Sequence, residues 1–114
     1  MQTAVNESNG QLDRIYRNAP SVVELKDTST GAVYTIEKST SITDYVVFNP
    51  GINGKRGTAD FDEDGYKYMF CVEPAIAVGN YTINPLQTWT GTQTISYKKD
   101  DSIINSNGLF DFIQ

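Results

Sequence analysis

The sequence contains no histidine, and this absence excludes more chemistry than any residue that is present. A Ser–His–Asp or Cys–His catalytic arrangement needs an imidazole, and protein zinc sites are built mainly from histidine and cysteine. The single cysteine, Cys71, excludes a disulfide within the chain and suits a reducing compartment. We therefore expect no metal site and a cytoplasmic location.

Basic residues and long apolar runs are also scarce. Nine lysines and arginines stand against 14 aspartates and glutamates, which gives a formal net charge of −5. The basic residues are scattered, whereas nucleic acids and anionic membranes require a concentrated positive patch. No apolar run approaches the ~20 residues of a membrane-spanning helix, and the first residues show no signal-peptide pattern. We expect neither a nucleic acid nor a membrane as partner.

The residues that are present favour strands and turns. At 114 residues, of which 39% are hydrophobic, the chain has room for one domain with a modest core. Two β-rich runs, residues 22–26 and 32–38, flank a loop ending in Gly31, a pattern typical of a hairpin with glycine in a left-handed conformation. A third run, residues 44–48, stops at Asn49-Pro50-Gly51. No segment has a helical period, so residues 1–114 are predicted to form one all-β, antiparallel sandwich domain.

Two further segments alternate with a period of two. In residues 66–73, the alternation predicts a core face and an opposite face ending at Glu73, with Pro74 terminating the strand; the predicted core residues are Tyr66, Tyr68, Phe70 and Val72. In residues 88–97, the threonines are expected on the solvated side of a half-buried strand. The apolar end of the tail, residues 109–113, is expected to dock as an extra strand.

Carboxylates are the remaining candidates for chemistry. Glu73 follows Met69 and Cys71 on its face, and an apolar flank would raise its pKa toward the range of a general base. The ordinary alternative is an exposed glutamate without a role. Asp13 and Ile15 share one face of a second alternating segment, where an Asp13–Arg14 surface pair is the ordinary interpretation. The acidic group Asp60, Asp62, Glu63 and Asp64 is followed by Gly65, but Cys71 stands where an EF-hand loop needs its closing glutamate, so a solvated acidic loop is the interpretation.

Taken together, these segments resemble the glucose-6-phosphate 1-epimerases of the aldose 1-epimerase (galactose mutarotase-like) superfamily. The similarity covers residues 12–97, with 98–114 as an extension, and it rests on short motifs in the family's order: Asp13-Arg14-Ile15-Tyr16, Val46-Val47-Phe48-Asn49-Pro50, Ala59-Asp60-Phe61, Gly65-Tyr66-Lys67, Cys71-Val72-Glu73 and the stretch from Leu86 to Trp89.

The resemblance implies part of a β-supersandwich that binds a sugar on its concave face. It implies a carbohydrate isomerase that interconverts the α and β anomers of a hexose 6-phosphate without a cofactor. The residue matching Glu73 would be the general base on the anomeric hydroxyl, and the residue matching Asp13 would hold sugar hydroxyls. A histidine would protonate the ring oxygen.

The chain departs from this family in one large respect. Its motifs are those of the family's C-terminal part, so the histidine acid and the phosphate-binding arginines have no counterpart here. We expect exposed strand edges that pair with a second copy or with the missing N-terminal half, and weak or no activity of the chain alone. Two alternatives remain open: a non-catalytic sugar-binding or assembly module, with Trp89 or a tyrosine as a stacking surface, and a purely structural β-domain.

Overall fold

The structure is a computed structural model, and it describes residues 2–5, 12–51, 64–106, 108 and 110–114. Within these ranges the chain forms strands, turns and two short 3₁₀ helices. None of its described helices has the length and apolar character needed to cross a membrane. The motif Ala59-Asp60-Phe61 and the acidic residues Asp60, Asp62 and Glu63 lie outside the described residues.

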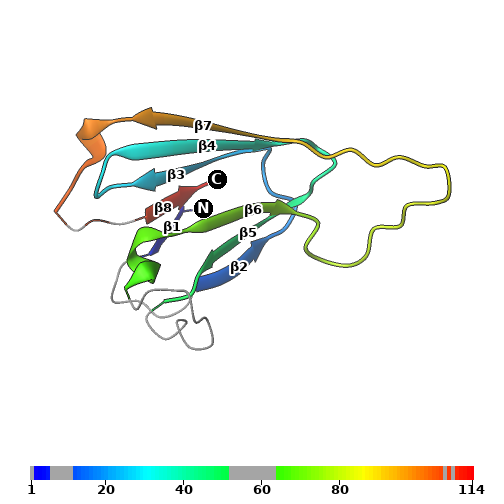
Figure 1. Cartoon of the computed structure of the whole chain (residues 1–114), viewed down its shortest axis with the longest axis horizontal. Helices are drawn as coiled ribbons and strands as arrows, with labels where there is room; N and C mark the ends of the chain where they lie inside the picture. Colours follow the sequence, from blue (N-terminus) through cyan, green and yellow to red (C-terminus); the bar gives the residue numbers. More distant parts are fainter. Residues whose placement is uncertain (1, 6–11, 52–63, 107, 109) are drawn as a thin grey trace.

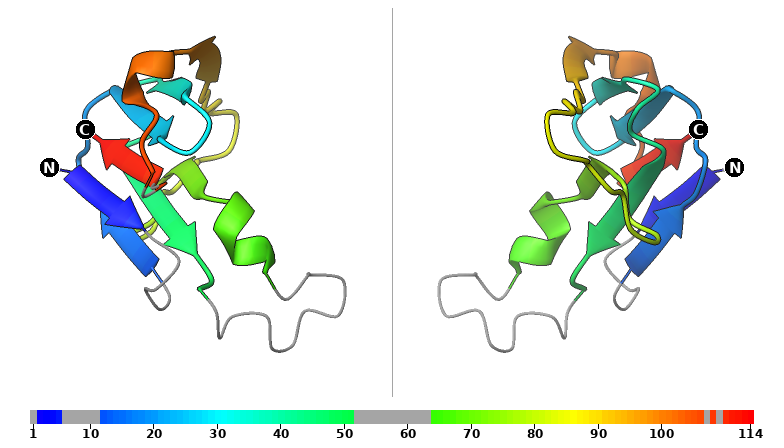
Figure 2. Two further views of the ribbon diagram at one scale, coloured as in Figure 1. Left: turned by 90° about the vertical axis from the view of Figure 1, so that its left-hand side faces the viewer. Right: turned by 90° about the vertical axis from the view of Figure 1, so that its right-hand side faces the viewer.

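The strands form two antiparallel sheets that pack against each other (Figures 1 and 2). Sheet A has the order β1-β8-β3-β4-β7, and sheet B has the order β2-β5-β6. The elements are β1 (Gln2–Val5), β2 (Leu12–Tyr16), β3 (Val22–Asp27), β4 (Ala32–Lys38), β5 (Asp44–Asn49), η1 (Gly65–Tyr68), β6 (Cys71–Ala75), β7 (Gln93–Lys99), η2 (Asp101–Ile103) and β8 (Phe110–Ile113). The predicted all-β sandwich is confirmed.

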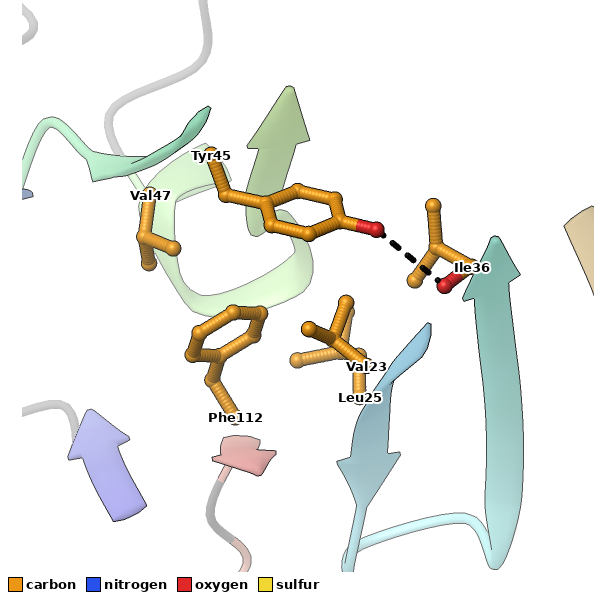
Figure 3. Close-up of a cluster of buried hydrophobic side chains, with 6 residues drawn as sticks. All are labelled: Val23, Leu25, Ile36, Tyr45, Val47 and Phe112. Atoms are coloured by element: carbon orange, nitrogen blue, oxygen red, sulfur yellow. Dashed lines mark hydrogen bonds between the residues drawn. The ribbon is translucent and has the colours of Figure 1, made fainter. Parts of the chain in front are cut away.

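The core lies between the inner faces of the two sheets (Figure 3). Phe112 of β8 is fully buried and contacts the rings of Tyr16 and Tyr45, with centroids 5.2 and 6.3 Å away. The other buried members of this cluster are Val23, Leu25, Ile36 and Val47. The Tyr45 hydroxyl lies 3.0 Å from the carbonyl oxygen of Ser21 and 3.3 Å from that of Ile36. Burial raises the pKa of Tyr45 to about 12, so this hydroxyl keeps its proton as a donor.

Several local predictions are confirmed. The β3–β4 hairpin forms with Gly31 at φ +84°, and a Cβ at this position would come within 2.9 Å of the Asp100 carbonyl oxygen. A side chain there would therefore meet both a strained backbone and a backbone clash. The apolar tail forms β8, which inserts between β1 and β3 rather than adding at an edge.

Two predictions about alternating segments are wrong in part. Residues 66–73 do not form one strand, because Gly65–Tyr68 is a 3₁₀ turn that buries Tyr66 and leaves Tyr68 82% exposed. Pro74 does not end β6 but lies within it; among the described strands β6 is at the edge of its sheet, where a residue without an N–H is tolerated. Strand β7 starts only at Gln93, and all seven of its residues are exposed, on both faces.

Candidate functional site

The outer face of sheet B, which points away from sheet A, brings the two sequence-predicted residues together. Asp13 is paired with Phe48, and Phe48 with Cys71. One step along the same face, Ile15 is paired with Val46, and Val46 with Glu73. Directly paired residues project to the same side of an antiparallel sheet, and so do residues two apart in one strand. We call these six residues the carboxylate face.

On the carboxylate face, the two carboxylates flank an apolar floor. Asp13 lies on β2 and Glu73 on β6, the two edges of sheet B, and both are exposed. Two strand spacings and a two-residue offset put their Cα atoms about 12 Å apart. The floor between them is formed by side chains of β2 and β5 that are partly open to solvent: Ile15, Val46 and Phe48. An apolar floor with a few polar groups at its sides is the usual composition of a small-molecule site.

Glu73 lies at the centre of β6 rather than at the strand tip that the sequence suggested. Its side chain is exposed, so the described residues do not supply the apolar cover expected around it. Cys71 shares its face, as predicted, and is partly buried. Burial raises the pKa of the Cys71 thiol, and the negative charge of Glu73 raises it further. Cys71 is therefore a reporter of the charge on Glu73.

Two buried polar side chains of β5 fasten the two ends of β6. At one end, the Asn49 side-chain amide donates to the carbonyl oxygens of Tyr66 (2.9 Å) and Met69 (2.8 Å), and its oxygen accepts from the Gly51 N–H (2.8 Å). Asn49 is only 1% exposed, so these bonds replace water that cannot reach it. They fix η1 against β5 just before β6 begins. From the sequence alone Asn49 is only a turn residue and part of a family motif, because its hydrogen-bond partners are 17 and 20 residues away.

At the other end, the carboxylate of Asp44 accepts the backbone N–H groups of Ala77 (2.9 Å) and Asn18 (3.1 Å). Asp44 is 4% exposed, and the hydrogen bond from Ala77 is the largest of the effects that hold its pKa below the ordinary value of an aspartate. The buried ammonium of Lys38 donates to the carbonyl oxygen of Ala19 (3.0 Å), and the charge of Asp44 favours its protonated form. Burial is the larger effect on Lys38 and lowers its pKa.

Substitution of Asp44 by asparagine is expected to lower the free energy of unfolding by about 1–3 kcal/mol near neutral pH, because a buried, charged acceptor of two partly buried hydrogen bonds is lost. A carboxylate with a depressed folded-state pKa stabilises above its unfolded-state pKa, near 3.8, and this contribution is lost as pH falls through the folded-state pKa. Urea denaturation from pH 7 to pH 2 should therefore show a smaller acid-dependent loss in Asp44→Asn. Asp101→Asn, a substitution of an exposed aspartate, is the control and should lose as much stability in acid as the unmodified chain. If Asp44→Asn also lost as much as the unmodified chain, Asp44 would not have this role.

A separate hollow of about 220 Å³ lies between the β2–β3 and β4–β5 connections. Its lining includes Asn18, Ser21, Lys38 and Thr40, but neither Asp13 nor Glu73. Among the described residues, no group of three or more histidine, cysteine, aspartate or glutamate side chains is placed to hold a metal ion. The carboxylate face therefore remains the arrangement that agrees with the sequence candidates.

Comparison with known proteins bears on this face. The model of the family described as "Aldose 1-epimerase" matches residues 1–96, more than four fifths of the chain. The chain belongs to the aldose 1-epimerase family. It is also 31% identical over 86 residues to a Cenchrus ciliaris protein named "Putative glucose-6-phosphate 1-epimerase". That alignment covers 75% of this chain and 26% of the relative, so the chain spans about a quarter of the length of the curated relative it matches. No solved structure matches the chain.

Membership of the aldose 1-epimerase family confirms the resemblance drawn from the short motifs. The matched range contains both Asp13 and Glu73, and it contains all of sheet B. The roles of the two carboxylates are not fixed by this membership and remain predictions.

Proposed function

We propose that this chain forms the base-bearing sugar face of an isomerase that interconverts the α and β anomers of a hexose 6-phosphate such as glucose 6-phosphate. The observation that carries the proposal is the carboxylate face itself, where Asp13 and Glu73 stand on either side of an apolar floor. A pyranose ring has an apolar C–H side and a rim of hydroxyls. The apolar floor of the carboxylate face would contact the C–H side, and the two carboxylates would accept hydrogen bonds from the hydroxyls.

In the proposed reaction, the Glu73 carboxylate accepts the proton of the anomeric hydroxyl while an acid protonates the ring oxygen. The C1–O5 bond breaks, and the open-chain aldehyde rotates about its C1–C2 bond. The aldehyde then closes on the other side, as the O5 hydroxyl gives its proton back to the acid and Glu73 gives its proton back to O1. Asp13 accepts hydrogen bonds from sugar hydroxyls and holds the ring during this rotation. No step consumes an oxidant or another reactant.

The chain supplies the base of this mechanism but has no histidine to act as the acid. A positioned acid or base each contributes about 10²–10⁴-fold to a rate. The carboxylate of Glu73 is also exposed, whereas a general base works best after partial removal of water. We therefore propose that the acid, and the cover over Glu73, come from protein outside these 114 residues.

Titration with glucose 6-phosphate tests the binding half of the proposal. We expect NMR shift changes on the carboxylate face at millimolar sugar, together with slower alkylation of Cys71, the only cysteine. Asp13→Asn should weaken binding by about 10- to 150-fold, since a hydrogen bond to a charged acceptor contributes about 1.5–3 kcal/mol. Asp101→Asn, exposed and away from sheet B, is the matched control. Absence of both signals at millimolar glucose 6-phosphate would contradict the proposal.

The absence of histidine favours one second candidate, a non-catalytic sugar-binding module in which both carboxylates act only as hydrogen-bond acceptors. In that case Glu73→Gln, which keeps an acceptor oxygen, would weaken binding slightly. The substitution would also leave the rate of anomer interconversion unchanged in any assembly that contains the chain, because a sugar-binding module does not accelerate the reaction.

A further inference from the structure

The hollow between the β2–β3 and β4–β5 connections contains a buried charge that the proposed reaction does not use. Both connections pass from one sheet to the other at the same end of the sandwich (Figure 1). The Ala19 N–H joins them by donating to the Thr43 carbonyl oxygen (3.0 Å). Lys38, the last residue of β4, lines the hollow and is only 5% exposed, although the hollow itself opens to solvent.

The ammonium group of Lys38 has few partners for a buried cation. It carries three N–H donors, and among the described residues its only hydrogen-bond acceptor is the carbonyl oxygen of Ala19, at 3.0 Å. It also lies over the ring of Tyr45, whose centroid is 5.2 Å away. Because Ala19 lines the hollow too, its hydrogen bond places the ammonium group at the wall of the hollow. A buried charge of this kind is stabilised by any further acceptor that reaches it.

The carboxylate of Asp44 does not meet this need. Its charge favours the protonated form of Lys38, but its oxygens accept the backbone N–H groups of Asn18 (3.1 Å) and Ala77 (2.9 Å). Burial outweighs the charge of Asp44 and lowers the pKa of Lys38, so the ammonium group is only partly compensated. A negative charge in the hollow would supply the rest.

The remaining polar lining offers hydrogen-bond donors from two sides. Asn18 and Ser21 belong to the β2–β3 connection, and Thr40 belongs to the β4–β5 connection. Their amide and hydroxyl groups can all donate to an anion. Among the described residues that line the hollow, none is acidic. The lining therefore combines one buried cation with neutral donors on opposite walls.

We propose that this hollow binds a small tetrahedral oxyanion of the phosphate class, with the ammonium group of Lys38 as its charged partner. A tetrahedral oxyanion presents acceptor oxygens in several directions, so it can accept hydrogen bonds from both connections at once. Lysine is a common partner of phosphate, acting as a point charge. The volume of about 220 Å³ lies below the range of sites for drug-sized ligands, about 300–1,000 Å³, which favours a free anion or one phosphate group over a whole cofactor.

An oxyanion in this place would hold the two sheets together. Each connection leads from one sheet to the other, so an anion bound by both opposes their separation. A ligand that binds only the folded chain stabilises it increasingly as its concentration rises above the Kd. Neither Asp13 nor Glu73 lines the hollow, which would bind an oxyanion whether or not the chain takes part in catalysis.

Titration with inorganic phosphate, followed by NMR at constant ionic strength, tests this site. We expect saturable shift changes at millimolar phosphate in the amides of the two connections. Lys38→Met keeps the length of the side chain but removes the charge, and it should weaken binding at least tenfold, because a hydrogen bond from a charged donor is lost. Lys98→Met removes an exposed lysine from the outer face of sheet A and should bind phosphate like the unmodified chain.

A second variant keeps the test decisive if Lys38→Met does not fold. Asn18→Gly removes a neutral donor from the hollow, and glycine readily adopts the left-handed φ of +48° at this position. This variant should weaken phosphate binding by about two- to tenfold, the range for a neutral hydrogen bond.

Two further titrations identify the source of the oxyanion. Glucose 6-phosphate carries a phosphate group and glucose carries none, so glucose should leave the amides of the two connections unchanged. Changes with inorganic phosphate alone would assign the hollow to the free anion, and changes with glucose 6-phosphate would extend it to phosphate esters. Binding of glucose 6-phosphate at the carboxylate face is detected at different amides, so failure of one site is distinguishable from failure of the other.

Three outcomes would overturn the oxyanion site. These are no saturable change with either phosphate compound, equal changes in Lys38→Met, and equal changes with glucose. Phosphate also stabilises proteins generally because it is excluded from their surface, but that effect does not require Lys38 and would persist in Lys38→Met.

Discussion

Glutamine at position 73 is expected to abolish the acceleration of glucose 6-phosphate anomerisation in any assembly that joins this chain to a histidine-bearing partner. Glutamine has nearly the size of glutamate and still accepts a hydrogen bond, but it cannot accept a proton at neutral pH. Loss of a positioned base is expected to lower the rate by about 10²–10⁴-fold. The measurement is the exchange rate between the α and β anomers, followed by NMR and corrected for the spontaneous rate.

Two comparisons make this result specific. Glu37→Gln removes an exposed carboxylate from the outer face of sheet A and should leave the rate unchanged. The chain alone, with Glu73 intact but no histidine, should not exceed the spontaneous rate by more than a small factor. Strong activity of the isolated chain that disappears in Glu73→Gln would keep Glu73 as the base and remove the need for an outside acid. Full activity of the Glu73→Gln assembly would remove Glu73 from the mechanism.

The same substitution has an effect that needs no partner and separates charge from chemistry. Because the charge of Glu73 contributes to the raised pKa of the Cys71 thiol, glutamine at position 73 should lower that pKa. A change in the pH dependence of Cys71 alkylation would show that Glu73 is ionised beside the thiol even where catalysis is absent.

Sequence reasoning succeeded where the determining contacts are local. The β3–β4 hairpin depends on a turn with Gly31 in the left-handed region, and that requirement is visible in five consecutive residues. Alternation within β2 likewise placed Asp13 and Ile15 on one face and Leu12 and Tyr16 on the other. The latter two are partly buried against the core.

Sequence reasoning failed where distant groups decide the local structure. Residues 65–68 alternate like a strand, but the Asn49 side chain holds the carbonyl oxygens of Tyr66 and Met69 in a turn. In β7, alternation showed which residues share a face, but it could not show whether another layer covers either face. The placement of Asp13 and Glu73 on one face needs the strand order β2-β5-β6, which neither strand reveals by itself.

Truncation of Phe112 to alanine is expected to cost about 3–5 kcal/mol of the free energy of unfolding, the range for a fully buried aromatic side chain. Phe112 is 0% exposed and contacts rings from both β2 and β5, so the cavity would open at the centre of the core. Small domains have about 5–15 kcal/mol in total, so this loss would remove a large share of the stability of the chain. Urea denaturation followed by near-ultraviolet circular dichroism measures it, and Tyr68→Ala, at an 82% exposed aromatic residue, is the control.

The loss should also reach the beginning of the chain. β8 lies between β1 and β3, and β1 has no other partner among the described strands. Weakening of β8 should therefore release β1 as well, and hydrogen exchange should accelerate in β1 and β8 before it does in the β3–β4 hairpin. Phe112→Leu keeps most of the buried volume and should retain the slow exchange at a cost of about 1–2 kcal/mol. An unchanged urea midpoint in Phe112→Ala would mean that the two sheets are not joined through β8, and that the inner face of sheet A is not the core of this domain.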